Sequence, residues 1–223
     1  MDNDTNEPFS VSPPQGFFTH GHVIIIDDDV DILEVFSLVI RHFGYSYEAY
    51  VSADHYLSSS HYTKFPNKPT CILSDVKMPG MDGLMLQQQL AGTGSIPLIL
   101  MSGHCTPREI VKAYRNQLVD FLVKPFSNDE MLHAIATALK SHADQLDSDF
   151  IKKKYIEKFE FLSDQEKNIA FDVSKGLTSQ NIAEKLGIGL RTVKLYRKNI
   201  YRKMSVSSGN DFLRIMESIL NKE

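Results

Sequence analysis

The chain of 223 residues is 42% hydrophobic, 10% aromatic and 23% charged, a composition that excludes a disordered, collagen-like or coiled-coil protein. Its formal net charge of −4 hides an uneven distribution, because residues 1–140 hold 9 basic and 16 acidic side chains whereas residues 141–223 hold 15 basic and 12 acidic ones. The length favours two domains. No apolar run approaches the roughly 20 residues that span a membrane, and the polar N-terminus resembles no signal peptide. We therefore expect a cytoplasmic protein with no membrane partner.

Residues 1–21 are rich in proline and polar side chains, which predicts a flexible leader. After the leader, short apolar runs alternate with longer stretches of helical periodicity. We expect these runs to form five strands, at residues 23–26, 45–50, 70–74, 97–101 and 119–123. Because parallel strands need a crossover connection, residues 22–140 are predicted to form an α/β domain with a doubly wound, five-stranded parallel sheet.

Capping residues mark several helix starts. Thr106, Ser127 and Ser163 are each followed three residues later by a glutamate. This spacing is typical of the capping box at a helix N-terminus. Asp82, in the sequence M-D-G, is also expected to cap a helix.

The second half of the chain has a different pattern. Residues 141–160 are rich in charge and lack proline and glycine, so we expect a helical linker. Residues 161–223 show helical periodicity with no strand between the helices. This region is predicted to be an all-α, four-helix domain, with helices at residues 163–174, 178–186, 190–204 and 209–220.

Polar and charged side chains follow the predicted strands of the first domain. Asp27, Asp28 and Asp29 follow the first strand, Asp75 the third, Ser102 the fourth and Lys124 the fifth. Ligands of open α/β sheets bind at the carboxyl ends of the strands. Several carboxylates at one edge repel one another unless a cation joins them, and Mg²⁺ suits oxygen ligands of this kind.

This set of groups fits phosphoryl transfer, in which a carboxylate attacks phosphorus while cations neutralise the phosphoryl oxygens. The sequences I-I-I-D-D-D, C-I-L-S-D-V-K-M-P-G-M-D-G, L-I-L-M-S-G-H and D-F-L-V-K-P-F occur in this order along the chain. Together they closely resemble the receiver domains of two-component response regulators. The resemblance covers about residues 22–140.

The resemblance implies a role for each matching residue. Asp75 would be the phosphoacceptor, with a histidine kinase as donor, and Phe121 would be the aromatic switch residue. It further implies that Mg²⁺ is held by Asp27, Asp28, Asp75 and the backbone carbonyl of Lys77, that Ser102 and Lys124 contact the phosphoryl group, and that the Lys124-Pro125 bond is cis. Taken singly, these residues have simpler interpretations: the aspartates as a helix cap, Lys124 as a surface lysine and Ser102 as a turn residue.

The third helix of the second domain is strongly basic. No acidic residue occurs between Glu184 and Asp211. Six basic residues lie on the predicted helix: Arg191, Lys194, Arg197, Lys198, Arg202 and Lys203. A solvated face would explain a lone basic helix, but here a short helix and a G-I-G turn precede it, as in a helix-turn-helix whose second helix enters the major groove of DNA.

Residues 162 to about 215, including L-S-D-Q-E-K and R-T-V-K-L-Y-R-K-N-I-Y-R-K-M, resemble the LuxR/NarL-type DNA-binding domain. The resemblance implies that Lys194, Leu195 and Lys198 read bases in double-stranded promoter DNA. It implies phosphate contacts for Arg191, Thr192, Arg197 and Lys203. The apolar stripe of the last helix is either a dimer surface or part of the domain's own core.

A receiver followed by such a domain resembles the FixJ/NarL class. We therefore expect a transcription regulator rather than an enzyme, controlled by phosphorylation of Asp75 and forming a homodimer when phosphorylated. Two alternatives stay open at this point. One is a receiver-regulated protein-interaction module without specific DNA binding, and the other is a metal-dependent phosphatase with Asp75 as nucleophile.

Overall fold

The structure is a computed structural model that describes residues 20–59, 68–91, 96–103, 106, 108, 111 and 118–220. Residues 1–19 of the predicted leader lie outside this part of the chain, as does Glu109 of the predicted Thr106 capping box. Contacts divide the chain into two compact units, Met1–Leu146 and Asp147–Glu223. Each unit is described by itself.

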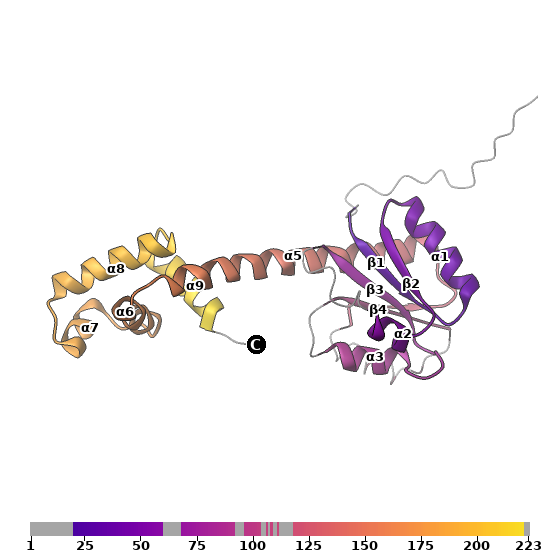
Figure 1. Cartoon of the computed structure of the whole chain (residues 1–223), viewed down its shortest axis with the longest axis horizontal. Coiled ribbons are helices and arrows are strands. Elements are labelled where there is room, and N and C mark those ends of the chain that lie inside the picture. Colours follow the sequence, from indigo (N-terminus) through magenta and orange to yellow (C-terminus); the bar gives the residue numbers. More distant parts are fainter. Residues whose placement is uncertain are drawn as a thin grey trace, which may run out of the picture. The chain divides into compact units, whose positions relative to one another are not determined.

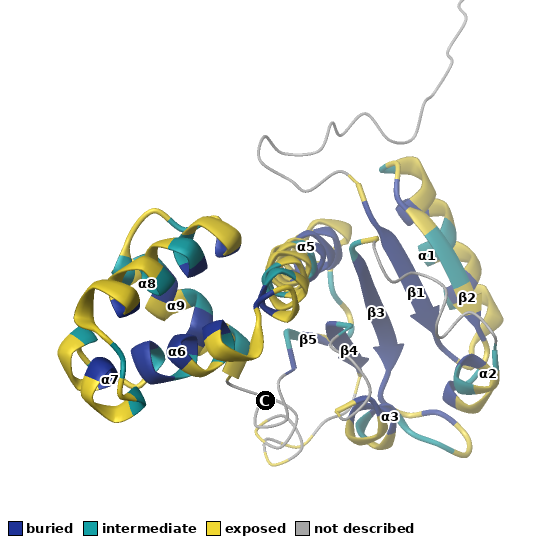
Figure 2. Ribbon diagram, turned by 60° about the vertical axis from the view of Figure 1, so that its left-hand side comes forward, coloured by how far each residue is buried: buried dark blue, intermediate teal, exposed yellow. Residues whose placement is uncertain are grey.

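The first unit contains a five-stranded sheet in which all neighbouring strands are parallel. Figure 1 labels strands β1 to β4 of this sheet, and Figure 2 shows the whole strand order, β2-β1-β3-β4-β5. Their bounds are β1 His22–Ile26, β2 Ser46–Tyr50, β3 Thr70–Asp75, β4 Leu98–Ser102 and β5 Asp120–Val123. The predicted parallel α/β fold is thus confirmed.

Helices cover both faces of this sheet, because alternate residues of a strand point to opposite sides. Val23 and Ile25 of β1 join a core with residues of α1 (Val30–His42) and of the first turns of α5 (Asn128–Glu160). Ile24 and Ile26 join the opposite core, with residues of α2 (Ala53–Ser58) and α3 (Gly83–Leu90). The three inner strands are buried along their whole length.

Several helices begin at the capping residues that the sequence contains. The Asp82 side chain accepts a hydrogen bond from the Met85 N–H at the start of α3, at 2.7 Å. Ser127 and Glu130 form a reciprocal pair at the start of α5, with bonds of 2.7 and 3.2 Å to each other's backbone N–H groups. Asp29 caps α1 by accepting from the Asp31 N–H at 2.9 Å. These local bonds fix where each chain segment turns from loop into helix.

Helix α5 includes all residues of the predicted helical linker, because it continues without a break from Asn128 to Glu160. Its first turns bury Met131, Ile135 and Leu139 against the sheet. Beyond Leu146 most of its side chains are exposed (Figure 2). No proline or glycine interrupts residues 141–160, so the change from buried to exposed surroundings leaves the backbone helical.

The described residues of the second unit after α5 form four helices, as predicted. They are α6 Asp164–Ser174, α7 Ser179–Leu186, α8 Leu190–Met204 and α9 Gly209–Leu220. Phe212 and Met216 of α9 are fully buried in the core of this unit, and Ile215 and Ile219 pack against the same core. The apolar stripe of α9 therefore serves the domain's own packing. In the described part of the chain, no helix combines the length and apolar character needed to cross a bilayer.

Candidate functional site

The register of the parallel strands brings the predicted receiver residues to one edge of the sheet. Ile26 pairs with Ser74, Asp75 with Met101, and Ser102 with Val123. Asp27 and Lys124 are the residues that directly follow β1 and β5, and Asp75 and Ser102 end β3 and β4. The carboxyl ends of four strands therefore carry these side chains at neighbouring positions.

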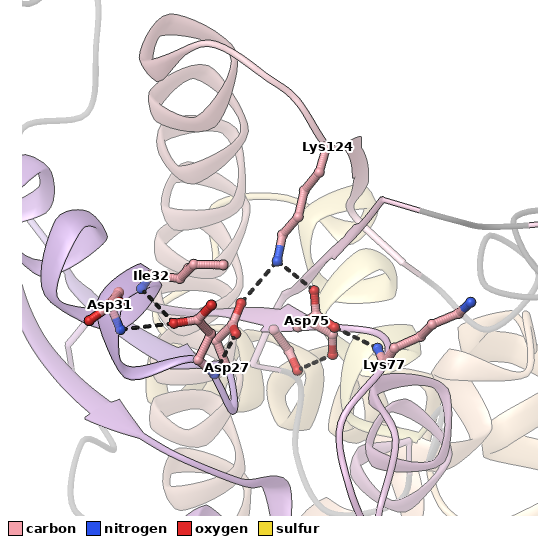
Figure 3. A network of polar contacts seen from close by, with 8 residues as sticks. Asp27, Asp31, Ile32, Asp75, Lys77 and Lys124 are labelled. Carbon is pink, nitrogen blue, oxygen red and sulfur yellow. Dashed lines mark hydrogen bonds and ion pairs between the residues drawn. The ribbon is translucent and has the colours of Figure 1, made fainter.

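The Lys124 ammonium joins two of the carboxylates (Figure 3). Its Nζ lies 3.0 Å from Asp27 Oδ2 and 2.6 Å from Asp75 Oδ1. The other oxygen of Asp75, Oδ2, accepts a hydrogen bond from the Lys77 N–H at 2.6 Å. Asp27 and Asp75 are both buried, so the ammonium offsets a like-charge repulsion that water screens poorly at this depth.

Burial and the neighbouring polar groups shift the pKa values of Asp27 and Lys124 in opposite directions. Burial raises the pKa of Asp27, although hydrogen bonds from the Asp29 N–H and from Lys124 act to lower it. Burial alone would lower the pKa of Lys124, but its bonds to Asp75 and Asp27 outweigh burial and raise the pKa of the ammonium. Lys124 therefore stays positively charged at neutral pH.

The remaining predicted receiver residues occupy different surroundings. Asp28 and Lys77 are exposed beside this cluster, and the Ser102 side chain is buried at the end of β4. Phe121 is half-buried in β5, where it pairs with Leu100 and packs against the core that α2 and α3 cover. The Lys124-Pro125 peptide bond is cis, as expected.

The oxygen donors at this edge fit Mg²⁺. No group of three His, Cys, Asp or Glu side chains that could hold a metal ion occurs among the described residues. Mg²⁺ needs only one or two carboxylates, because water and phosphate oxygens complete its coordination. Asp27 and Asp75 supply such donors, as does the neighbouring Asp28. Their closeness follows from the Lys124 ammonium nitrogen, which lies 3.0 Å from Asp27 and 2.6 Å from Asp75.

Gly83 allows the start of α3 to lie directly against the end of β3. A Cβ atom at this position would lie 2.5 Å from the Asp75 carbonyl oxygen and 2.9 Å from a Leu100 methyl carbon. We predict that Gly83→Ala lowers the free energy of unfolding of the receiver by about 1 to 3 kcal/mol, the usual cost of overpacking. Gly103→Ala is the control, because its nearest neighbour would lie 3.9 Å away. Urea unfolding would show a clear loss of stability for Gly83→Ala and a much smaller change in stability for Gly103→Ala.

A second candidate site lies along α8. Arg191, Lys194 and Lys198 are exposed on this helix, as are Thr192 and Leu195. Val193, Ile200 and Met204 of the same helix are buried. A cavity of about 500 Å³ lies along the helix, and it is lined by Ser179, Lys194, Arg197, Lys198, Tyr201, Arg202, Val206 and Ser207.

Two of the predicted phosphate-contacting cations already have partners within the domain. Arg197 donates hydrogen bonds to Ser179 Oγ and to the Tyr201 hydroxyl, both at 3.0 Å. Lys203 Nζ lies 2.6 Å from Glu166 Oε2. An ammonium has three N–H donors, so the ion pair leaves donors of Lys203 for another acceptor. Ser179, Tyr201 and Arg202 of the cavity were not among the predicted contacts, although Tyr201 and Arg202 follow Lys198 at helical spacing.

Glu166 has two roles, since its carboxylate bonds to Lys203 and completes the capping box of α6 with Ser163. Burial alone would raise its pKa, but the Lys203 ammonium and the bonds from Ser163 outweigh burial and lower the pKa. A pKa lowered by folding means that ionised Glu166 stabilises the domain above about pH 4.3, the unfolded value. This contribution is lost as the pH falls through the folded pKa.

We predict that Glu166→Gln lowers the free energy of unfolding by about 1 to 2 kcal/mol at neutral pH, an estimate that allows for the partial exposure of Lys203. The stability difference between wild type and variant should shrink between about pH 5 and pH 3. Urea unfolding of the full chain, followed by circular dichroism at several pH values, measures it. Glu160→Gln removes an exposed partner of Lys167 instead and should have a smaller effect. A difference that did not change with pH would contradict the assigned ion pair.

Comparison with known proteins shows the family of each of the two units. Residues 23–136 match the family model of the response regulator receiver domain, and residues 160–216 match that of bacterial regulatory proteins of the luxR family. Response regulator protein TodT of Pseudomonas putida is 37% identical over 88% of this chain and 86% of its own. Transcriptional regulatory protein FixJ of Bradyrhizobium diazoefficiens is 28% identical over 88% of this chain and 95% of its own.

Two solved structures are similar over most of the chain. The response regulator StyR matches with a TM-score of 0.68 at 29% identity, covering 88% of this chain and 98% of StyR. Full-length FixJ from B. japonicum matches with a TM-score of 0.53 at 26% identity, covering 91% of this chain and 98% of FixJ.

A parallel sheet with acidic residues and a lysine at its carboxyl edge, followed by a helix-turn-helix unit, defines a receiver joined to a DNA-binding effector. The chain belongs to the response regulators of two-component systems, in the FixJ/NarL class, and is a phosphorylation-controlled DNA-binding transcription regulator. A receiver domain implies a histidine kinase as partner, and receiver domains generally bind Mg²⁺ at the phosphorylation site.

Proposed function

We propose that Asp75 accepts a phosphoryl group from a histidine kinase and that this changes the affinity of the α8 surface for promoter DNA. The observation that carries the proposal is the position of the Lys124 ammonium, 2.6 Å from Asp75 and 3.0 Å from Asp27 at the carboxyl edge of the sheet. A cation placed there can neutralise the oxygens of a transferred phosphoryl group.

In the proposed transfer, a carboxylate oxygen of Asp75 forms a bond to phosphorus while the bond from phosphorus to the kinase histidine nitrogen breaks. The imidazole keeps the electron pair of the broken bond. Because Lys124 already contacts Oδ1 of Asp75, a phosphoryl group on this oxygen would lie beside the same ammonium. The Lys77 N–H, 2.6 Å from Oδ2, holds the carboxylate in a fixed orientation during the attack.

Mg²⁺ would be held by one or two of the carboxylates of Asp27, Asp28 and Asp75 and by the backbone carbonyl of Lys77, with water and phosphate oxygens completing its coordination. When bound, the ion supplies positive charge that stabilises the phosphoryl oxygens. The buried Asp27 also bonds Lys124 at 3.0 Å, so it holds the ammonium at the site. Ser102, buried at the end of β4, is the proposed hydroxyl partner of the phosphoryl group.

Phe121 is the proposed link between the phosphorylated site and the surface of the receiver. It lies on β5, the strand next to the one that Ser102 ends, and its side chain is half-buried. A half-buried ring has room for a second packing arrangement, as two-state switches require. A movement of Ser102 toward the phosphoryl group would favour the inward position of Phe121 and thereby favour a homodimer.

The α8 surface is the proposed DNA interface. Lys194, Leu195 and Lys198 are exposed where base contacts are expected, and Arg191 and Thr192 are exposed at the start of the helix. Arg197, held by Ser179 and Tyr201, and Lys203, held by Glu166, are pre-oriented for phosphate contacts. Pre-orientation lowers the entropy lost when a side chain binds.

The test is DNA binding by the full chain to a duplex selected from a random-sequence pool, measured by fluorescence anisotropy over a range of salt concentrations. We expect the logarithm of the association constant to fall with a slope of about −0.9 per neutralised phosphate. Lys194→Ala combined with Lys198→Ala should weaken binding by about 10² or more, since each lost base contact costs about 1 to 3 kcal/mol.

Lys175→Ala removes an exposed lysine at the end of α6 and serves as the control with little expected effect. If no duplex is enriched, or if binding does not depend on salt, the α8 surface does not bind DNA specifically. That outcome would favour the protein-interaction module instead.

A further inference from the structure

Lys124 lies in a short connection between β5 and α5. The strand ends at Val123, and the Lys124 N–H still donates to the Ser102 carbonyl of β4 at 2.9 Å. At the start of α5, the Ser127 N–H donates to Glu130 Oε2 at 2.7 Å. Residues 124–126 therefore cross from the edge of the sheet to the capped end of a helix, and the ammonium is carried by the first of them.

An aromatic contact ties this connection to α1. The Phe126 ring stacks on the Phe36 ring, with centroids 5.9 Å apart and planes inclined by 29°. Both rings are half-buried, and both pack against the core that the sheet shares with α1 and α5. Helix α1 begins two residues after Asp27, where Asp29 caps it. The stacked rings thus join the connection that carries Lys124 to the helix that follows Asp27.

The Lys124 side chain reaches across the carboxyl edge of the sheet. Strand β4 separates β5 from β3, and β1 lies beyond β3. Neighbouring strands are about 4.8 Å apart, so β3 is about 10 Å from β5 and β1 is about 14 Å from it. The ammonium nevertheless lies 2.6 Å from Asp75 and 3.0 Å from Asp27 (Figure 3). A side chain that spans this distance has little slack to correct a displaced backbone.

We propose that Phe36 is a positioning residue for phosphoryl transfer, because its contact with Phe126 fixes the backbone from which the Lys124 ammonium extends. This role rests on the proposed function, in which that ammonium neutralises the oxygens of the transferred group. Misplacing a reacting group by about 1 Å can slow a reaction by about 10²-fold, even when the change lies far from the chemistry. Phe36 acts through Lys124 and takes no part in the bond changes.

Phe43 makes it possible to separate positioning from packing. It also belongs to the end of α1, is half-buried and packs against the same core. It lies near the opposite edge of the sheet, because β2, which follows it, begins at Ser46 beside His22, the first residue of β1. Phe36→Leu and Phe43→Leu remove the same ring from the same core. The first breaks the contact with the Lys124 connection, and the second changes packing at the far edge.

The test is the initial rate of phosphorylation of the full chain by radiolabelled acetyl phosphate with Mg²⁺, after circular dichroism and urea unfolding have shown that each variant is folded. We expect Phe36→Leu and Phe126→Leu each to lower the rate by about tenfold. The double variant should be within about twofold of either one, since both break the same contact. Phe36→Tyr, which keeps an aromatic face, should stay within about threefold of wild type, as should the Phe43→Leu control.

A double-mutant cycle with Lys124→Ala shows whether the effect passes through the ammonium. Once Lys124 is alanine, there is no ammonium left to misplace. Adding Phe36→Leu should then change the remaining rate by less than about twofold. A ring that supported the site in some other way would lower the rate by the same factor with and without Lys124.

The positioning role is contradicted if Phe36→Leu is phosphorylated as fast as wild type or if Phe43→Leu slows the transfer equally. It is also contradicted if the tenfold effect of Phe36→Leu persists in the Lys124→Ala protein. In each of these cases wild type still takes up phosphate on Asp75, so the proposed function stands. A wild-type chain that took up no phosphate would contradict the proposed function itself, and the positioning role with it.

Discussion

The Asp75→Asn variant should gain no phosphoryl group when the full chain is incubated with acetyl phosphate and Mg²⁺, whereas wild type should gain one. The reason is chemical: an amide lacks the anionic oxygen that attacks phosphorus. Asparagine is close to aspartate in size, so it can occupy the same buried position at the end of β3. Mass spectrometry of the intact protein measures the result directly.

Asp164→Asn is the control, because Asp164 is an exposed residue in the first turn of α6, in the other unit of the chain. It should gain one phosphoryl group at the wild-type rate. Phosphorylation of Asp75→Asn to the same extent as wild type would mean that another side chain is the acceptor.

The Lys124→Ala variant should be phosphorylated about 10² to 10³ times more slowly than wild type, the usual effect of removing one group that stabilises the charge of a transition state. It should also be less stable, because Asp27 and Asp75 would lose the cation that lies 3.0 and 2.6 Å from them. Breaking a fully buried ion pair costs about 3 to 5 kcal/mol. Lys124 is 24% exposed, so we expect a smaller loss, of about 1 to 3 kcal/mol.

The initial rate of phosphorylation and the urea midpoint separate these two effects. Lys140→Ala, an exposed position on α5, should change neither quantity. Lys124→Arg keeps the positive charge, so it should retain more stability than Lys124→Ala even where its different shape slows the transfer. A Lys124→Ala protein with the wild-type rate would remove the ammonium from the mechanism.

Much of the receiver could be predicted from the sequence, because buried parallel strands are short apolar runs and their ends carry the polar residues. The sequence therefore predicted which polar residues follow the strands, namely Asp27, Asp75, Ser102 and Lys124. The sequence did not predict how these residues are arranged in space, since their arrangement depends on the strand order β2-β1-β3-β4-β5. In this order Lys124 reaches Asp27, 97 residues away in the chain.

The continuity of α5 was missed for a related reason. The pattern of side chains changes near residue 140 from buried apolar to exposed charged, and this was interpreted as the start of a helical linker. Helix formation along the backbone does not require a constant environment, only the absence of residues that end it. Proline and glycine are absent between residues 141 and 160.

In the helical domain too, local sequence patterns predicted the helices but not the contacts between them. Its helices could be predicted closely from capping residues and helical periodicity, both of which are properties of neighbouring residues. The ion pair of Lys203 with Glu166 joins residues 37 apart in the chain, and the bond of Arg197 to Ser179 joins residues 18 apart. Such contacts depend on how α6, α7 and α8 pack together.

The most direct test of the account is the DNA affinity of the full chain measured with and without acetyl phosphate, for wild type and for Asp75→Asn. We predict that the phosphodonor changes the affinity of wild type for its selected duplex by at least about tenfold, a coupling free energy within the usual 1 to 3 kcal/mol. The affinity of Asp75→Asn should be unaffected by the phosphodonor. Equal affinities for both proteins under both conditions would contradict control of DNA binding by phosphorylation.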